Sequence, residues 1–134
     1  MNYQNRVLLI ERQSLFTPFL TKLLEESGAT VVSYATLPHA LRLRQMLPDV
    51  VCIDVDHLTV PPFDGIRGVR HALPSARIVA YTNREDRSWY ALARTVGADV
   101  VLGPDAQIED FAAAAHVRPS SRLAPRRIAA EGAG

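Results

Sequence analysis

The sequence contains almost no lysine or cysteine, and it has no long apolar run. Lys22 is the only lysine among 15 basic residues, so a site that needs a lysine elsewhere cannot be complete. The single cysteine, Cys52, lies inside an apolar run, which favours a buried, reduced thiol and excludes an intrachain disulfide. No apolar segment approaches the roughly 18 residues that a membrane span needs. The N-terminal segment is also too short and polar for a signal peptide. We therefore expect a cytoplasmic protein.

Five short apolar segments alternate with segments of helical periodicity, which predicts a doubly wound α/β fold around a parallel sheet. The expected strands are 6–10, 30–35, 48–56, 76–82 and 98–102. The expected helices are 14–28, 38–46, 64–74, 86–96 and 105–116. These segments predict one domain over residues 1–116. The remaining residues, 117–134, are rich in Pro, Ala, Gly and Arg, which predicts a disordered tail or the start of a linker.

The segment Pro48–Asp56 combines a continuous apolar run with two carboxylates at its end, Asp54 and Asp56. Strands that are buried on both faces of a parallel sheet have this pattern. Ligands of open α/β sheets bind at the carboxyl ends of the strands. The pattern therefore predicts that Asp54 lies at the edge of the sheet where binding or chemistry takes place.

Five segments, in this order, resemble the receiver domain of two-component response regulators, most closely the receivers of NarL-type helix-turn-helix transcription factors. The segments are VLLIERQSLF, PDVVCIDVD, PPFDG, LPSARIVAYT and GADVVL. The resemblance covers residues 6 to about 116. It implies a flavodoxin-like sheet with strand order 2-1-3-4-5 and a role in signal transduction and transcriptional regulation.

The resemblance also assigns roles to individual residues. In the family, the aspartate that ends the third strand accepts a phosphoryl group from a histidine kinase, and Asp54 matches it. Thr82 matches a threonine that contacts the phosphoryl oxygens. Two acids after the first strand help to hold Mg²⁺; Glu11 matches one of them, but Arg12 stands at the position of the other.

Further departures from the family pattern predict that this phosphorylation chemistry is lost. The family lysine falls on Gly103 or Pro104, and the aromatic residue of the fifth strand falls on Val101. Mg²⁺ requires near-octahedral oxygen ligation, whereas Arg12 is permanently charged, repels the ion and can pair with Asp54. Phosphoryl transfer depends on positioning and charge neutralisation. We therefore expect no Mg²⁺, no other cofactor and no enzymatic activity.

Two residues next to Asp54 have alternative interpretations. Asp56 can extend an acidic pocket, but we prefer an ion pair with Arg12 or Arg84. His57 has no second His or Cys at metal-ligand spacing, so we interpret it as a loop histidine rather than a metal ligand.

Two adjacent aromatic residues, Trp89 and Tyr90, begin the helix predicted over residues 86–96. Both cannot face the core of one helix, and exposed aromatic residues are enriched at protein interfaces. The residues of this helix that we expect in the core are Leu92, Ala93 and Val96. We expect a protein partner or a second copy of the chain to bind the face formed by this helix, the strand with Val101 and the last helix.

The sequence leaves three functions open. We prefer an atypical receiver domain that acts as a signalling, protein-interaction and dimerisation module, independent of Mg²⁺-dependent phosphorylation. The first alternative is a working phosphoacceptor that a histidine kinase phosphorylates on Asp54. The second is a small-molecule sensor whose pocket borders the loop 58–63. A net charge of +1 gives no reason to expect direct nucleic-acid or membrane binding by this domain.

Overall fold

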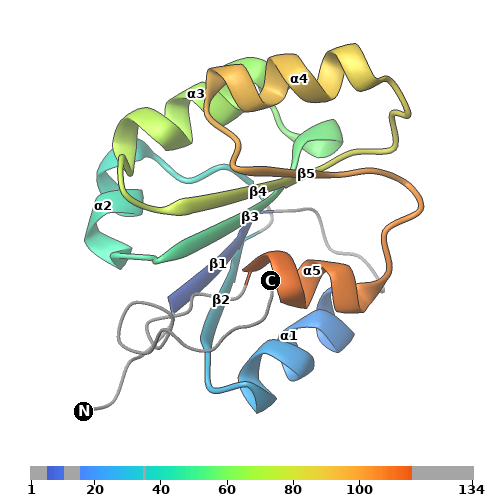
Figure 1. Ribbon diagram of the computed structural model, residues 1–134. Helices are drawn as coiled ribbons and strands as arrows, with labels where there is room; N and C mark the ends of the chain where they lie inside the picture. Colours follow the sequence, from blue (N-terminus) through green and yellow to red (C-terminus); the bar gives the residue numbers. More distant parts are fainter. Residues whose placement is uncertain (1–5, 11–15, 35, 116–134) are drawn as a thin grey trace, which may run out of the picture.

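The apolar runs form a parallel sheet of five strands in the order β2-β1-β3-β4-β5, which confirms the expected fold class (Figure 1). The strands are β1 (Arg6–Ile10), β2 (Thr30–Tyr34), β3 (Val50–Asp54), β4 (Arg77–Tyr81) and β5 (Val100–Leu102). The structure, a computed structural model, describes residues 6–10, 16–34 and 36–115. Glu11, Arg12, Ser14 and the segment 117–134 lie outside these ranges, so the predictions made for them stay predictions.

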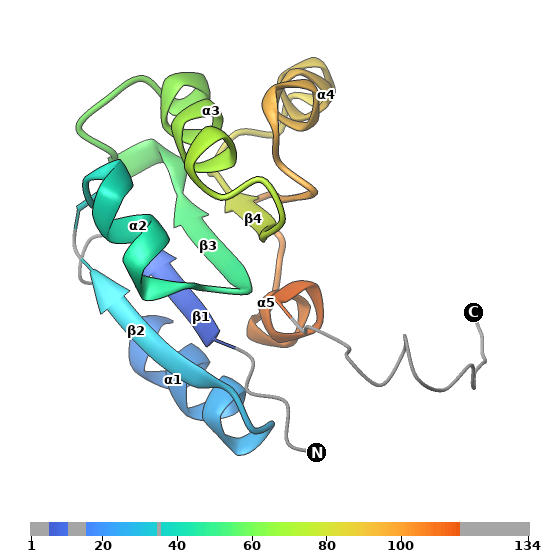
Figure 2. The ribbon, with the colours of Figure 1, turned by 90° about the vertical axis from the view of Figure 1, so that its left-hand side faces the viewer.

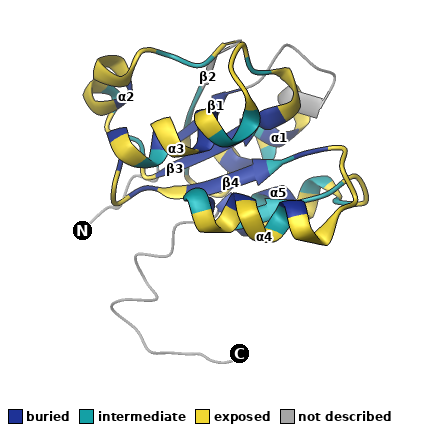
Figure 3. Cartoon of the chain, turned by 90° about the horizontal axis from the view of Figure 1, so that it is seen from above, coloured by how far each residue is buried: buried dark blue, intermediate teal, exposed yellow. Residues whose placement is uncertain are grey.

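Helices cover both faces of the sheet, as in doubly wound folds. The helices are α1 (Phe16–Glu26), α2 (Ala40–Met46), α3 (Pro62–Ala72), α4 (Arg87–Val96) and α5 (Ile108–Ala115). α1 and α5 lie on one face, whereas α2, α3 and α4 lie on the other (Figures 1 and 2). The central strands are dark blue between the two helix layers in Figure 3, since their side chains are buried on both sides. None of the described helices is long and apolar enough to cross a membrane.

The chain leaves β3 earlier than predicted. β3 ends at Asp54, and Val55–His57 form one turn of 3₁₀ helix, η1. The Asp54 carboxylate caps this turn by accepting a hydrogen bond from the backbone N–H of Asp56. The following helix, α3, begins at Pro62 instead of residue 64. Proline is favoured at the first position of a helix because its missing N–H would have no partner there.

The orientation of α4 differs from the prediction. Trp89 is 8% exposed, and its ring packs 5.1 Å from the ring of Phe63, whereas Leu92 is 52% exposed. Ala93 is fully buried, as expected. The expectation that Leu92 faces the core is therefore wrong. Trp89 and Ala93 face inward because they are four residues apart on one helix face, and the large indole ring buries more apolar surface than a leucine side chain.

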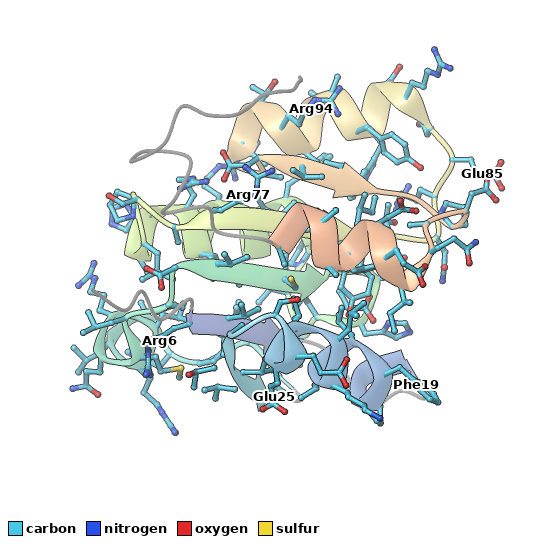
Figure 4. The ribbon with its side chains drawn as sticks, turned by 60° about the horizontal axis from the view of Figure 1, so that its bottom comes forward. Arg6, Phe19, Glu25, Arg77, Glu85 and Arg94 are labelled. Atoms are coloured by element: carbon cyan, nitrogen blue, oxygen red, sulfur yellow. The ribbon has the colours of Figure 1, made fainter. Side chains whose placement is uncertain are left out.

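Arginine side chains bond to carbonyl groups at helix C-termini along the amino edge of the sheet. Arg6 Nε donates to the carbonyl of Met46 in α2 at 2.8 Å, and Arg77 Nε donates to the carbonyl of Ala114 in α5 at 2.6 Å. Arg70 donates to the carbonyl of Gly97, which ends α4. Figure 4 shows Arg6 and Arg77 on this side of the molecule. These bonds satisfy terminal carbonyls and place positive charge at the negative ends of the helix dipoles.

Gly97 provides a test of this edge. Its φ of +139° is strained for any residue with a side chain, and a Cβ there would lie 2.7 Å from the Cβ of Arg70. We expect Gly97→Ala to lower the free energy of unfolding by roughly 1–3 kcal/mol in urea titrations. Gly68→Ala is the matched control, since its Cβ would meet no atom within 4 Å. This helical substitution should raise stability by roughly 0.5–1 kcal/mol; equal effects of the two substitutions would contradict the packing described.

Candidate functional site

A hollow of about 230 Å³ opens at the carboxyl ends of β3 and β4. The strand register explains its position, since Asp54 pairs with Tyr81 and both strands then end at the same edge of the sheet. Its polar lining residues include Asp54, Asp56, His57 and Thr82. Gly103, Pro104 and Phe111 also line it, and the ring of Phe111 meets the Tyr81 ring edge-on with the ring centroids 4.7 Å apart. The structure therefore brings together three of the sequence-predicted site residues: Asp54, Asp56 and Thr82.

Both oxygens of the Asp54 carboxylate accept hydrogen bonds. The imidazole Nδ1 of His57 lies 2.7 Å from Oδ2, and the backbone N–H of Asp56 lies 3.2 Å from Oδ1. An ionised carboxylate only accepts hydrogen bonds, so this contact is a hydrogen bond in the form of His57 that has its proton on Nδ1. The Asp54 side chain is 13% exposed and that of His57 is 45% exposed. His57 is thus a direct partner of Asp54 as well as a residue of the connecting turn, and its three-residue spacing from Asp54 was the available sequence signal.

Asp56 bonds to the end of β4 rather than to an arginine of the described chain. The hydroxyl of Thr82 donates to the two carboxylate oxygens of Asp56 at 2.9 and 3.1 Å, and the backbone N–H of Asn83 donates at 2.6 Å. The Arg84 guanidinium instead lies 5.3 Å above the ring of Trp89. The ion pair expected between Asp56 and Arg84 is therefore absent from the described residues. Pairing with Arg12 stays a prediction.

Tyr90 approaches Gly103, one of the residues that line the hollow. Its phenol O–H donates to the backbone carbonyl of Arg84, and the oxygen lies where a side chain at position 103 would begin. Gly103 is therefore required by the close approach of Tyr90, and a lysine at this position would collide with the phenol. The sequence showed that the lysine is missing but did not show that Tyr90 fills its place.

The proposed interface residues have different environments. Trp89 is buried and contacts Phe63, so its ring is not presented to a partner. Tyr90 and Val101 are half-buried. Leu92, which we expected in the core, is instead the exposed apolar residue on the outer side of α4.

The described residues do not form a metal site in this arrangement. No group of three or more His, Cys, Asp or Glu side chains among them is placed to hold a metal ion. The oxygens of Asp54 and Asp56 are engaged by His57, Thr82 and Asn83. Mg²⁺ would have to share these oxygens with their donors or displace the donors to gain carboxylate ligands. Whether Glu11 contributes to such a site lies outside the described residues, so the absence of Mg²⁺ stays a prediction.

Comparisons with known proteins agree with the sheet topology. No protein-family model and no curated protein sequence matches the chain. Solved structures do match, and those compared below are response regulators. The chain has the receiver-domain fold.

Three of these structures show the extent of the likeness. A beryllofluoride-activated NtrC4 receiver-domain dimer superposes with a TM-score of 0.74 at 20% identity, covering 83% of this chain and 93% of that one. The orphan response regulator HP1043 of H. pylori gives 0.69 at 20% identity, with 89% and 96% covered. A response regulator of Burkholderia pseudomallei, solved with a phosphorylated aspartic acid and a calcium ion, gives 0.67 at 22% identity, with 89% and 71% covered. At sequence identities this low, the structural likeness shows the fold of this chain alone.

The contact between Tyr90 and Gly103 can be tested by restoring the missing lysine. We expect Gly103→Lys to destabilise the protein by roughly 1–3 kcal/mol, since the new side chain must displace the phenol and break its bond to Arg84. In a Tyr90→Ala background the same substitution should cost much less, which urea unfolding of the four proteins would show as a coupling energy. Additive costs would mean that Tyr90 does not occupy the lysine position.

Proposed function

We propose that the protein is an atypical receiver domain that acts as a signalling and protein-interaction module without Mg²⁺-dependent phosphorylation of Asp54. The observation that carries this proposal is the engagement of both Asp54 oxygens, one of them by the His57 ring. A carboxylate that attacks a phosphoryl donor needs an accessible oxygen and a neutralised surrounding, and hydrogen bonds to both oxygens make them weaker nucleophiles. Asp54 is mostly buried and lies beside a second carboxylate, Asp56, so its surroundings are acidic.

Charge compensation is the second support for the proposal. Gly103 and Pro104, the two positions that can correspond to the receiver lysine, line the hollow, and the chain has no lysine after Lys22. Among the described residues, hydrogen-bond donors rather than cations balance the two carboxylates. Arg12 follows β1 directly in the sequence, and we propose that it pairs with Asp54 and replaces the metal as the positive charge of the pocket.

Acetyl phosphate separates this function from that of a working phosphoacceptor. Incubation with acetyl phosphate and Mg²⁺ should leave the intact mass of the protein unchanged, because both Asp54 oxygens are hydrogen-bonded and no lysine follows Lys22 in the chain. The response regulator of Burkholderia pseudomallei, which was solved phosphorylated, is a suitable positive control. A mass gain of one phosphoryl group that Asp54→Asn abolishes would establish the alternative, a working phosphoacceptor at Asp54.

The face formed by α4, β5 and α5 is the interaction surface that we propose. β5 is the edge strand of the sheet, and the two helices flank it (Figure 1). The half-buried Tyr90 and Val101 supply apolar surface in the groove between α4 and α5. The exposed charges that line this groove are Arg87 on α4, Asp110 on α5, and Glu85 and Asp105 in the flanking loops. A two-fold pairing would set Arg87 of one copy near the acidic side chains of the other, so this face is complementary to itself.

Arg87 provides the test of a homodimer. We expect Arg87→Glu to weaken self-association at least about tenfold in sedimentation equilibrium, since it replaces the exposed cation of the groove with a charge like that of Asp110. Lys22→Glu is the matched control, because Lys22 is an exposed cation on α1 and does not line the groove between α4 and α5. A monomeric wild-type protein at all concentrations, or equal weakening by both substitutions, would count against this surface.

Binding of a small molecule is the remaining candidate function, and we now propose a different position for the ligand than the loop 58–63. Leu58 packs against Gly65, and the ring of Phe63 packs on Trp89, so the loop before α3 is closed onto the helix layer. The hollow beside Asp54 is bordered by Gly103 and Pro104 instead. A ligand of this protein would therefore contact the loop between β5 and α5.

A further inference from the structure

The carboxylate of Asp56 accepts hydrogen bonds from two donors at the end of β4. These donors are the hydroxyl of Thr82 and the backbone N–H of Asn83, and both bond to its carboxylate at 2.6–3.1 Å. Hydrogen bonds to a charged acceptor are about twice as strong as neutral ones. Thr82 is 4% exposed, so its hydroxyl depends on an acceptor from the protein. The carboxylate therefore fixes the position of the chain as it leaves β4.

An anion attached to Asp54 would compete for the same donors. Asp54 and Asp56 line one hollow with Thr82 and Asn83, and a phosphoryl group would present charged acceptor oxygens there. We infer that Asp56 is a built-in substitute for that phosphoryl group. Its carboxylate holds the segment 82–90 in its present conformation without any modification of the protein. This inference rests on the proposed function and names how the site is regulated.

A continuous set of contacts leads from Asp56 to Tyr90 on α4. The Thr82 hydroxyl oxygen accepts a hydrogen bond from the backbone N–H of Arg84 at 3.2 Å. The carbonyl of Arg84 accepts the phenol O–H of Tyr90, and its guanidinium lies over the ring of Trp89. The position of Asp56 is thereby coupled to Tyr90, the half-buried aromatic residue next to β5.

Removal of the carboxylate tests the inference in the full chain. Asp56→Ala should speed amide hydrogen exchange in residues 83–90 by about tenfold, because Thr82 and Asn83 lose a charged acceptor. Trp89 is the only tryptophan, and its emission should shift as Arg84 leaves its ring. Asp56→Asn should have a smaller effect, since its single oxygen can still accept one of the two bonds. Asp64→Ala is the control, because it removes an exposed carboxylate that pairs with Arg67.

Chemical rescue separates this role from simple packing. Formate added to Asp56→Ala should slow exchange in residues 83–90 toward the wild-type rate and leave Thr82→Val unaffected. The effects of Asp56→Ala and Thr82→Val should also be non-additive, because both remove the same contact. Exchange within twofold of wild type in a folded Asp56→Ala, additive effects, or the absence of rescue would each overturn the inference.

The two proposals fail in different ways. If acetyl phosphate modifies Asp54 while Asp56→Ala still loosens residues 83–90, the proposed function is wrong and the anchoring role of Asp56 stands. If Asp54 stays unmodified while Asp56→Ala leaves these residues unchanged, the function stands and the substitute role is wrong.

Discussion

The structure of the site depends on the hydroxyl of Thr82, a nearly buried residue that lines the hollow beside the exposed Asp56. The carboxylate of Asp56 accepts its hydrogen bond, and this contact accounts for the path of the neighbouring chain. β3 has to end at Asp54 and turn through η1 so that the next carboxylate can reach β4. The loop after β4 is then held by Asn83 and Arg84, and α4 begins from a fixed point with Asp86 as its N-cap.

The two carboxylates of the site have separate roles because they have separate donors. Asp54 is engaged by His57 from its own turn, and Asp56 by Thr82 across the sheet. Among the described residues, hydrogen bonds therefore stabilise the two carboxylates. The phenol of Tyr90 occupies the space where a side chain at position 103 would begin. Tyr90 also bonds to the carbonyl of Arg84, so the contacts of Asp56 and Tyr90 belong to one connected set.

Sequence reasoning reached the fold because the parallel sheet has strong local signals, namely the buried runs and the helix periodicity between them. It placed Asp54 at the end of a strand, where the structure has it. It failed for α4, since helical periodicity allowed either Leu92 or Trp89 inward and only packing against Phe63 decides. It also missed the contact between Asp56 and Thr82, because charge matching favours Arg84, whereas the strand register brings Thr82 closer.

We propose that the hydrogen bonds of Asp54 and Asp56 persist in the presence of a phosphoryl analogue and Mg²⁺. Backbone amide spectra recorded during titration with beryllofluoride and Mg²⁺ test this proposal, since beryllofluoride activates the structurally similar NtrC4 receiver. The signals of Asp54, Asp56, Thr82 and Asn83 should not move. Saturable shifts of these signals that propagate to Tyr90 would show instead that the site accepts the analogue.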